Sequence, residues 1–217
     1  MPRILYNRIL EILGGASNVY EVFLSSDELD RFNRHEIYKI KKLEEVHSVI
    51  GRALSENQKI LVVCNQVKRA QAVYLSLQED NPNIPIMLIH SHFRRVDRQR
   101  LEESLTNHYN VSSEACIVVS TQVVEVSLDI SFDMMITECA PIDALIQRFG
   151  RVNRKRTRET IGHYKPIYVI APYGGTDALP YDEEVLRRSY DVLPNGAVLE
   201  ENNCLLYTSD AADDRIS

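Results

Sequence analysis

Apolar and polar residues follow a regular succession between residues 59 and 170. Nearly continuous apolar runs are typical of strands that are covered on both faces of a parallel sheet. Such runs occur at 60–64, 84–89, 116–120, 133–138 and 167–170. Between them, apolar residues recur at the spacing of one helix face, over 67–77, 94–105 and 142–149. Short buried strands that alternate with helices indicate βαβ units, so we predict an α/β fold in which helices flank a doubly wound parallel sheet.

The pattern is less regular on either side of this central part. Helical spacing over 4–13 would end at Gly14 and Gly15, and residues 19–24 have the composition of a strand. Residues 27–50 are charged and helix-like, and a further helix is expected at 181–190. The expected divisions are a connector with an N-terminal strand and helix at 1–50, the main lobe at 51–175, and the start of a C-terminal extension at 176–203.

Composition excludes several classes of protein. The chain has 217 residues and is 44% hydrophobic, which is enough for a packed core and too much for a disordered chain. No apolar run approaches the ~18 residues of a membrane span, and the start lacks a signal-peptide pattern, so we expect no membrane partner and a cytoplasmic location. The 4 cysteines lack metal-binding spacing, which favours reduced thiols. The net charge of −6 argues against a wholly basic nucleic-acid binder but allows a local basic channel.

The C-terminal residues look foreign to the rest of the chain. Residues 204–217 resemble the translation of an adapter used to prepare sequencing libraries. We therefore expect them to be an artefact without a biological role and leave them out of the fold prediction. The alternative is a genuine acidic tail.

Three arginines recur at a spacing of three residues, at Arg148, Arg151 and Arg154. On a helix or a tight helical turn this spacing places them on one face. Pro141 suits the start of such a helix and Gly150 its end. Because planar guanidinium groups match phosphate oxygens, a polyphosphate is the expected ligand. The alternative is a solvated basic face.

Polar residues follow several of the predicted strands directly. In a parallel sheet these positions meet at one edge, where open α/β folds bind ligands. The Thr121 hydroxyl and the amides after it are suited to holding a phosphate, and Asp129 to accepting from a sugar hydroxyl. The alternatives are a plain helix cap at Thr121 and an ordinary loop residue at Asp129. The other candidates at this edge are Asn65, Ser91 and His92.

The arginine stretch resembles a known motif. Gln-Arg-x-Gly-Arg-x-x-Arg over 147–154 is similar to the last signature motif of superfamily 2 helicases, which lies in their second RecA-like lobe. The resemblance implies a RecA-like fold in which Arg151 and Arg154 act as catalytic arginine fingers on ATP bound to the first lobe. It also implies that Gln147 lies near the attacking water and that Arg148 supports the cofactor site. A finger of this kind is worth roughly 10³–10⁵ in rate.

A longer set of motifs narrows the resemblance. The runs 120–133, 140–143 and 147–154, together with His90-Ser91 and Phe93, resemble the CRISPR-associated helicase–nuclease of type I interference systems. Relatives often carry arginine where this chain has His92, which is mostly neutral near pH 7. The resemblance implies that Asp129 lies by the ATP ribose. It implies contacts with single-stranded DNA for Thr121, Gln122, Ser91, His92 and Asn65.

Several parts of a complete motor are not found in the sequence. The chain has no Gly-x-x-x-x-Gly-Lys-Ser/Thr phosphate loop, no Asp-Glu-x-His motif and no His-Asp pair. The resemblance therefore implies that a separate first lobe of the same full-length protein holds ATP and Mg²⁺. The other implied partners are the nuclease domain and a CRISPR surveillance complex. We expect this fragment to be inactive as an ATPase alone.

Two other functions remain open from the sequence. One is the helicase lobe of a general repair or RNA superfamily 2 enzyme. The other is a non-catalytic Rossmann-like binding module. The lack of Gly-x-Gly-x-x-Gly after any predicted strand counts against a dinucleotide site in such a module.

Overall fold

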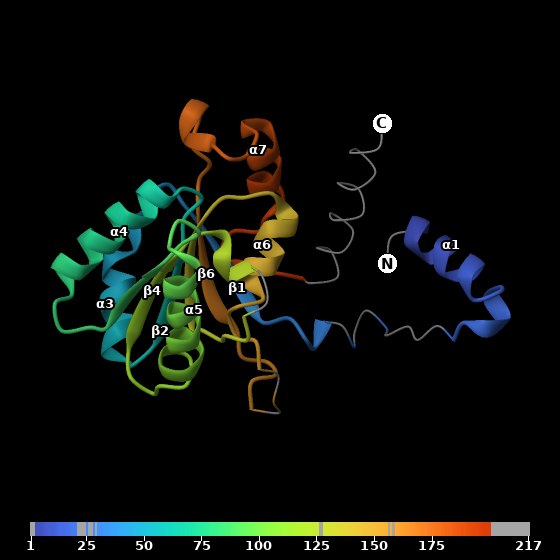
Figure 1. Cartoon of the computed structure of the whole chain (residues 1–217), viewed down its shortest axis with the longest axis horizontal. Helices are drawn as coiled ribbons and strands as arrows, with labels where there is room; N and C mark the ends of the chain where they lie inside the picture. The colour runs from blue at the N-terminus through green and yellow to red at the C-terminus, as the bar shows by residue number, and fades with distance from the viewer. Residues whose placement is uncertain are drawn as a thin grey trace. The chain divides into compact units, whose positions relative to one another are not determined.

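The computed structural model describes residues 3–20, 25, 28, 30–125, 128–155, 157 and 159–200. The chain divides into two compact units, residues 1–33 with 200–217 and residues 34–199. The first unit contains α1 (Arg3–Ile12), which confirms the predicted N-terminal helix, and a short turn at Ala16–Asn18 (Figure 1). The predicted strand at 19–24 falls largely outside the described residues, and so does the suspect tail at 204–217.

The described residues of the second unit form a seven-stranded sheet in the order β3-β4-β2-β5-β6-β1-β7. All neighbours pair in parallel except β7, which is antiparallel to β1. This confirms the predicted α/β fold with a mostly parallel sheet flanked by helices. The strands are β1 (His35–Ile40), β2 (Lys59–Val63), β3 (Ile86–Ile89), β4 (Cys116–Ser120), β5 (Met134–Glu138), β6 (Lys165–Ile170) and β7 (Ala197–Val198).

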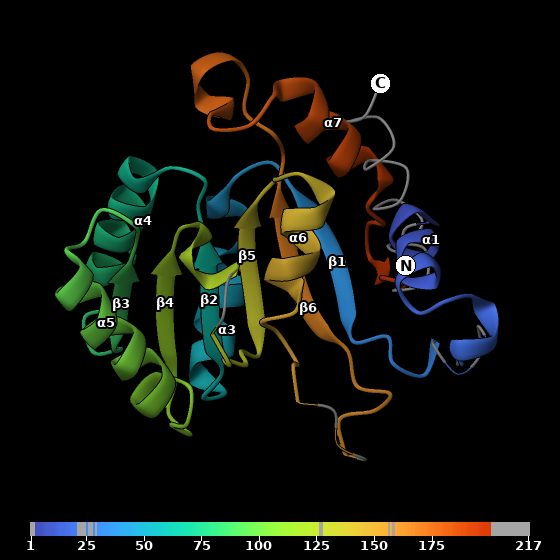
Figure 2. The same cartoon turned by 45° about the vertical axis from the view of Figure 1, so that its right-hand side comes forward.

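Helices cover both faces of the sheet. On one face lie α3 (His47–Ser55) and α4 (Val67–Asp80), and on the other lie α5 (Arg95–Ser104) and α6 (Ile142–Phe149) (Figures 1 and 2). A last helix, α7 (Glu183–Val192), follows β6. The central strands are buried on both faces, which explains why their sequences are apolar without alternation.

One core lies between the sheet and the α3–α4 face. Ile60, Val62 and Cys64 of the β2 region and Ile117 and Val119 of β4 belong to it, with helix residues such as Ile50 and Leu77 packed against them. The alternate residues of the same strands point to the α5–α6 face. Each central strand therefore packs against helices on both faces of the sheet. Because these strands are parallel, their carboxyl ends lie at one edge.

The helical prediction for residues 27–50 was wrong for the part that forms β1. Residues 35–40 pair with β6 in parallel along the whole strand, from His35 with Lys165 to Ile40 with Ile170. Buried and partly exposed residues alternate only partly along β1, and its charged residues hide the apolar pattern expected of a strand. This pairing makes the compact unit begin at Arg34, within the stretch that the sequence placed in the connector.

Two further properties follow from the fold. No helix among the described residues is long and apolar enough to cross a membrane. Cys64, Cys116 and Cys139 are buried free thiols. Burial raises the pKa of Cys116 to about 11 and that of Cys139 to about 12, so both are protonated and unreactive near neutral pH.

Candidate functional site at the carboxyl ends of the strands

The α6 helix and the turn after it place the three arginines. Pro141 precedes α6 and Gly150 ends it, as the sequence predicted. The backbone then turns through Asn153, which has a φ of 50°. The arginines therefore do not lie along one continuous helix, yet each guanidinium group contacts one or more of Val124, Glu125, Leu128 and Asp129.

Arg148 lies inside the protein, with 0% of its side chain exposed. Its Nε donates to Glu125 Oε1 at 2.8 Å, and one terminal nitrogen donates to Thr137 Oγ1 at 3.0 Å and to the Glu138 carbonyl at 3.1 Å. The other terminal nitrogen donates to Asn65 Oδ1 at 3.0 Å. Arg148 thus links the ends of β2 and β5 to the turn after β4, and supports the site from within.

Arg151 is also buried, with 7% exposure, but its partners are main-chain carbonyls. Nε donates to Val124 at 2.8 Å, and the two terminal nitrogens donate to Leu128 and Glu125 at 2.7 Å each. Burial, and then the positive charge of Arg154, lower the pKa of Arg151. The group still remains charged, because an ordinary guanidinium titrates far above neutral pH.

Arg154 is the most exposed of the three. Its Nε lies 2.8 Å from Asp129 Oδ1, and the two side chains are 40% and 79% exposed. An exposed ion pair of this kind contributes only about 0–1 kcal/mol, so either partner is free to exchange it for a ligand. Gln147 is exposed on α6 nearby in the chain.

Asn65 is engaged within the protein at both ends of its side-chain amide. Nδ2 donates to the Cys139 carbonyl at 2.7 Å, while Oδ1 accepts from Arg148. Gln122 Nε2 donates to the Asn65 carbonyl at 3.0 Å. A ligand contact through the Asn65 side chain or through Gln122 Nε2 would require one of these bonds to be exchanged.

Sequence reasoning missed Glu138, a buried carboxylate at this edge. It is 3% exposed and accepts from Arg69 Nε and from the Asn65 backbone N–H, each at 2.5 Å. The Arg69 guanidinium also stacks 4.7 Å from the centre of the Tyr173 ring. A charged residue at the end of an otherwise apolar strand was the signal in the sequence.

His90 and Thr121 lie at the ends of the neighbouring strands β3 and β4, since Ile89 pairs with Ser120. They are 5% and 1% exposed. Among the described residues, neither His90 Nδ1 nor Thr121 Oγ1 has a hydrogen-bond partner. Burial, followed by the charge of His92, lowers the pKa of His90, so its ring is neutral near pH 7.

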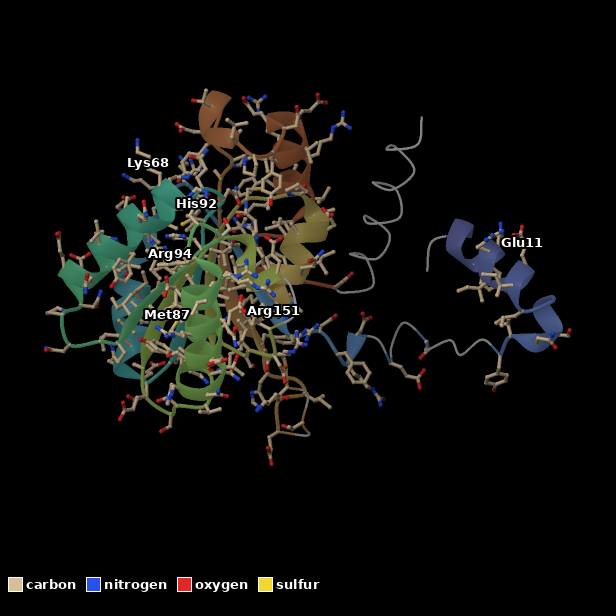
Figure 3. The ribbon with its side chains drawn as sticks, in the orientation of Figure 1. Glu11, Lys68, Met87, His92, Arg94 and Arg151 are labelled. Carbon is tan, nitrogen blue, oxygen red and sulfur yellow. The ribbon has the colours of Figure 1, made fainter. Side chains whose placement is uncertain are left out.

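The aromatic ring of Phe93 packs against His90. The His90 and Phe93 rings stack with centroids 4.2 Å apart, and His92 lies edge-on to His90 at 6.0 Å. Ser91 and His92 themselves are exposed. Exposed basic residues begin the adjoining helices, with Lys68 at the start of α4 and Arg94 before α5 (Figure 3). This part of the edge therefore presents donors and positive charge to solvent.

The segment after β6 covers the other part of the edge. Gln66 Nε2 donates to the carbonyls of Thr176 at 3.2 Å and Leu179 at 3.0 Å. Arg69 donates to the Asp177 carbonyl at 3.0 Å. The tips of β2 and β5 are thus closed by the chain itself.

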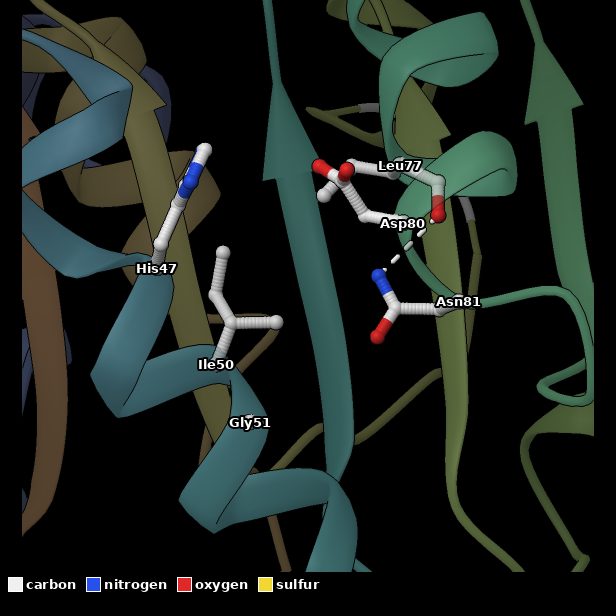
Figure 4. A pocket seen from close by; sticks show the side chains of 6 residues that line it. All are labelled: His47, Ile50, Gly51, Leu77, Asp80 and Asn81. Atoms are coloured by element: carbon white, nitrogen blue, oxygen red, sulfur yellow. Dashed lines mark hydrogen bonds between the residues drawn. The ribbon is translucent and has the colours of Figure 1, made fainter.

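A cavity of about 190 Å³ lies elsewhere, between α3 and α4 (Figure 4). It is lined by His47, Ile50, Gly51, Leu77, Asp80 and Asn81. It belongs to the face of the sheet opposite α6, so it is separate from the arginine site. Among the described residues, no group of three or more His, Cys, Asp or Glu side chains is placed to hold a metal ion.

Known proteins resemble this chain in sequence and in fold. Residues 56–157 match the family model described as CRISPR-associated nuclease/helicase Cas3, C-terminal. A CRISPR-associated nuclease/helicase Cas3 of Methanothermobacter thermautotrophicus is 34% identical over 163 residues, which covers 73% of this chain and 19% of the relative. The chain thus spans about a fifth of that relative's length.

Two solved structures show the same fold. The crystal structure of T. fusca Cas3-ATP superposes with a TM-score of 0.75 at 22% identity, covering 91% of this chain and 26% of that one. A chain of a CRISPR RNA-guided surveillance complex, pre-nicking, superposes with a TM-score of 0.68 at 24% identity, covering 83% of this chain and 25% of that one. At these identities the likeness is one of fold.

Proposed function

This chain belongs to the family of the CRISPR-associated nuclease/helicase Cas3 proteins, of which it is a C-terminal helicase part, and from that premise we propose a specific role. The chain forms the second RecA-like lobe of an ATP-dependent enzyme that translocates on single-stranded DNA in antiviral defence. Family membership favours this role over a general repair or RNA helicase and over a Rossmann-like binding module.

One observation carries the proposal. Thr121, a candidate DNA contact, and Asp129, a candidate nucleotide contact, lie only eight positions apart in the sequence, at the two ends of the stretch 121–129. Arg148, Arg151 and Arg154 all bond to this stretch. A motor needs nucleotide and DNA sites that respond to one another, and here a single segment joins the two.

The nucleotide side consists of exposed groups that suit a triphosphate. Arg154 is free to leave Asp129 for a phosphate oxygen, and Asp129 is then free to accept from the ribose. Gln147 is exposed for a contact with the attacking water. When bound, ATP with Mg²⁺ supplies the phosphoryl group that is transferred to water, and we propose that the first lobe holds both.

The DNA side consists of the tips of β3 and β4. Thr121 Oγ1 and His90 Nδ1 lack hydrogen-bond partners among the described residues, while a phosphodiester oxygen offers a strong acceptor. Gln122, Ser91 and His92 line the same edge, with Lys68 and Arg94 beside it. Contacts of this kind with the backbone do not read sequence, which suits translocation.

The proposed partners follow from the family. They are single-stranded DNA, the first lobe and the nuclease domain of the same full-length protein, and a CRISPR surveillance complex. This chain alone is then expected to show no ATP turnover, because it carries only one side of the nucleotide site.

Arg154→Ala in the full-length protein tests the assignment. Removing a finger from the transferring phosphoryl group should lower the kcat of ATP hydrolysis by roughly 10³-fold or more while ATP affinity changes little. Single-turnover hydrolysis and equilibrium nucleotide binding measure the two separately. A kcat equal to that of the wild type would overturn the finger assignment.

A further inference from the structure

We propose that Arg151 is a positioning residue for residues 121–129, and that DNA binding depends on it even when no nucleotide is bound. This goes beyond the arginine-finger role, in which Arg151 acts only on bound ATP. It rests on the proposed function in one respect, namely that Thr121 and Gln122 at the start of this stretch contact single-stranded DNA.

The guanidinium N–H groups of Arg151 donate to backbone carbonyls at the end of a short turn. A short 3₁₀ turn spans Gln122–Glu125, and the last carbonyls of a helical turn have no partner within the turn itself. Arg151 donates to two of them, those of Val124 and Glu125, and to Leu128 further along. Each guanidinium nitrogen therefore bonds a different carbonyl, and together the three bonds fix the carbonyls of Val124, Glu125 and Leu128 relative to one another.

The backbone of Arg151 is itself anchored. Its N–H donates to the Arg148 carbonyl at 2.8 Å, and its carbonyl accepts from Phe132 at 2.9 Å. Val152 forms a parallel bridge with Phe132, just before β5. The backbone of Arg151 is thus fixed to both α6 and the sheet. Its guanidinium group connects these elements to the turn that follows Thr121.

Arg151 and Arg154 therefore have different tasks. Arg154 pairs with an exposed side chain and can move to a ligand, whereas Arg151 is 7% exposed and bonded to three main-chain carbonyls. Lysine retains the positive charge but has a single nitrogen, so it cannot reproduce a fork that reaches three separate carbonyls. Arg151→Lys consequently separates the positioning role from charge.

The experiment uses the full-length protein with Arg151→Lys, Arg151→Gln and the control Arg188→Lys. Arg188 is 70% exposed on α7 and pairs with Glu184. The probe is a fluorescent single-stranded oligothymidine, titrated without nucleotide. We expect Kd to rise about tenfold for both Arg151 variants, as for the loss of one strong buried hydrogen bond, and to stay within about twofold for the control.

Hydrogen exchange provides a second readout that does not require DNA. Amides of residues 122–130 should exchange faster in both Arg151 variants, with the rest of the lobe unchanged. Wild-type DNA affinity together with wild-type exchange in Arg151→Lys would overturn the proposal. Unfolding of the whole lobe in both variants would also overturn it, because the proposed role is local.

The same design separates the two proposals. If the wild-type protein does not bind single-stranded DNA, the proposed function fails, and the exchange measurement still decides whether Arg151 positions the stretch.

Discussion

The two halves of the strand-tip edge differ in how their buried polar groups are satisfied. At the tips of β2 and β5, Asn65 and Glu138 bond to Arg69 and Arg148, and the segment that leads to α7 closes over them. Even the Cys139 thiol there donates to a carbonyl of α7, that of Leu186, at 3.2 Å. At the tips of β3 and β4, His90 Nδ1 and Thr121 Oγ1 have no partner among the described residues.

This difference means that the polar groups of one half contribute to the stability of the fold, and those of the other half are available to a ligand. A buried polar group that pairs within the chain contributes to the free energy of unfolding, and losing its partner costs several kcal/mol. A buried polar group without a partner makes the free protein less stable by leaving a donor or acceptor unmet, and a ligand that meets it gains the difference. Substitutions in the two halves should therefore affect different measurements.

The largest expected effect comes from the closed half. Arg148→Met should lower the free energy of unfolding by about 3–5 kcal/mol, because Glu125, Thr137 and Asn65 all lose a buried donor. Chemical denaturation of the full-length protein, followed by a probe in this lobe, measures it. Arg188→Met is the matched control and should change stability by less than about 1 kcal/mol, as expected for an exposed pair.

If Arg148→Met and Arg188→Met lowered the free energy of unfolding equally, the tips of β2 and β5 would not depend on their internal polar bonds.

A smaller effect, on DNA affinity and not on stability, is expected at the tips of β3 and β4. Thr121→Val preserves the shape of the side chain and removes a hydroxyl that has no internal partner. The free energy of unfolding should stay within about 1 kcal/mol of wild type, while affinity for single-stranded DNA should fall about five- to tenfold. Denaturation and DNA titration on the same preparation measure both. A loss of stability without a loss of affinity would place Thr121 among the structural residues.

The smallest effect concerns pH. The pKa of His90 is lowered by burial and then by His92, so the unfolded chain binds more protons between the folded pKa and the unfolded value of about 6.5. The contribution of neutral His90 to the free energy of unfolding is fully present above the unfolded pKa of about 6.5. It declines as the pH falls from there toward the lower folded pKa. His90→Gln should remove this part of the pH dependence.

Unfolding midpoints of wild type and His90→Gln at about pH 7.5 and 5.5 measure it. Identical pH dependence in the two proteins would show that His90 protonates in the folded state as readily as in the unfolded chain.

Local patterns predicted most of the fold. The helix predicted at 142–149 has the same bounds in the structure, because Pro141 and Gly150 mark its ends and its apolar face is strongly one-sided. The strand at 35–40 was missed because half of its residues are polar or charged. Its pairing with β6, which lies 130 residues away in register, leaves no local trace.

The residues of the candidate site stay a prediction, and the structure adds an arrangement that the sequence did not indicate. The spacing of Arg148, Arg151 and Arg154 predicted a common polyphosphate target, whereas in the structure their guanidinium groups bond to Glu125, to main-chain carbonyls and to Asp129. The spacing did not show that Arg148 is fully buried, that Arg151 bonds carbonyls, or that Arg154 alone is well exposed. Nor did it show that Asn65 is engaged by Arg148 and Cys139.

By itself the sequence determined the α/β class, the order of most elements and the motifs that mark the family. These depend on the period of apolar residues and on residue types at short spacing, both of which are local properties. The tertiary structure alone decided which strand tips are closed and which guanidinium groups lie inside. The physical reason is that a buried hydrogen bond depends on which strands are neighbours, and strand order brings together residues such as Asn65 and Arg148 that are distant in the chain.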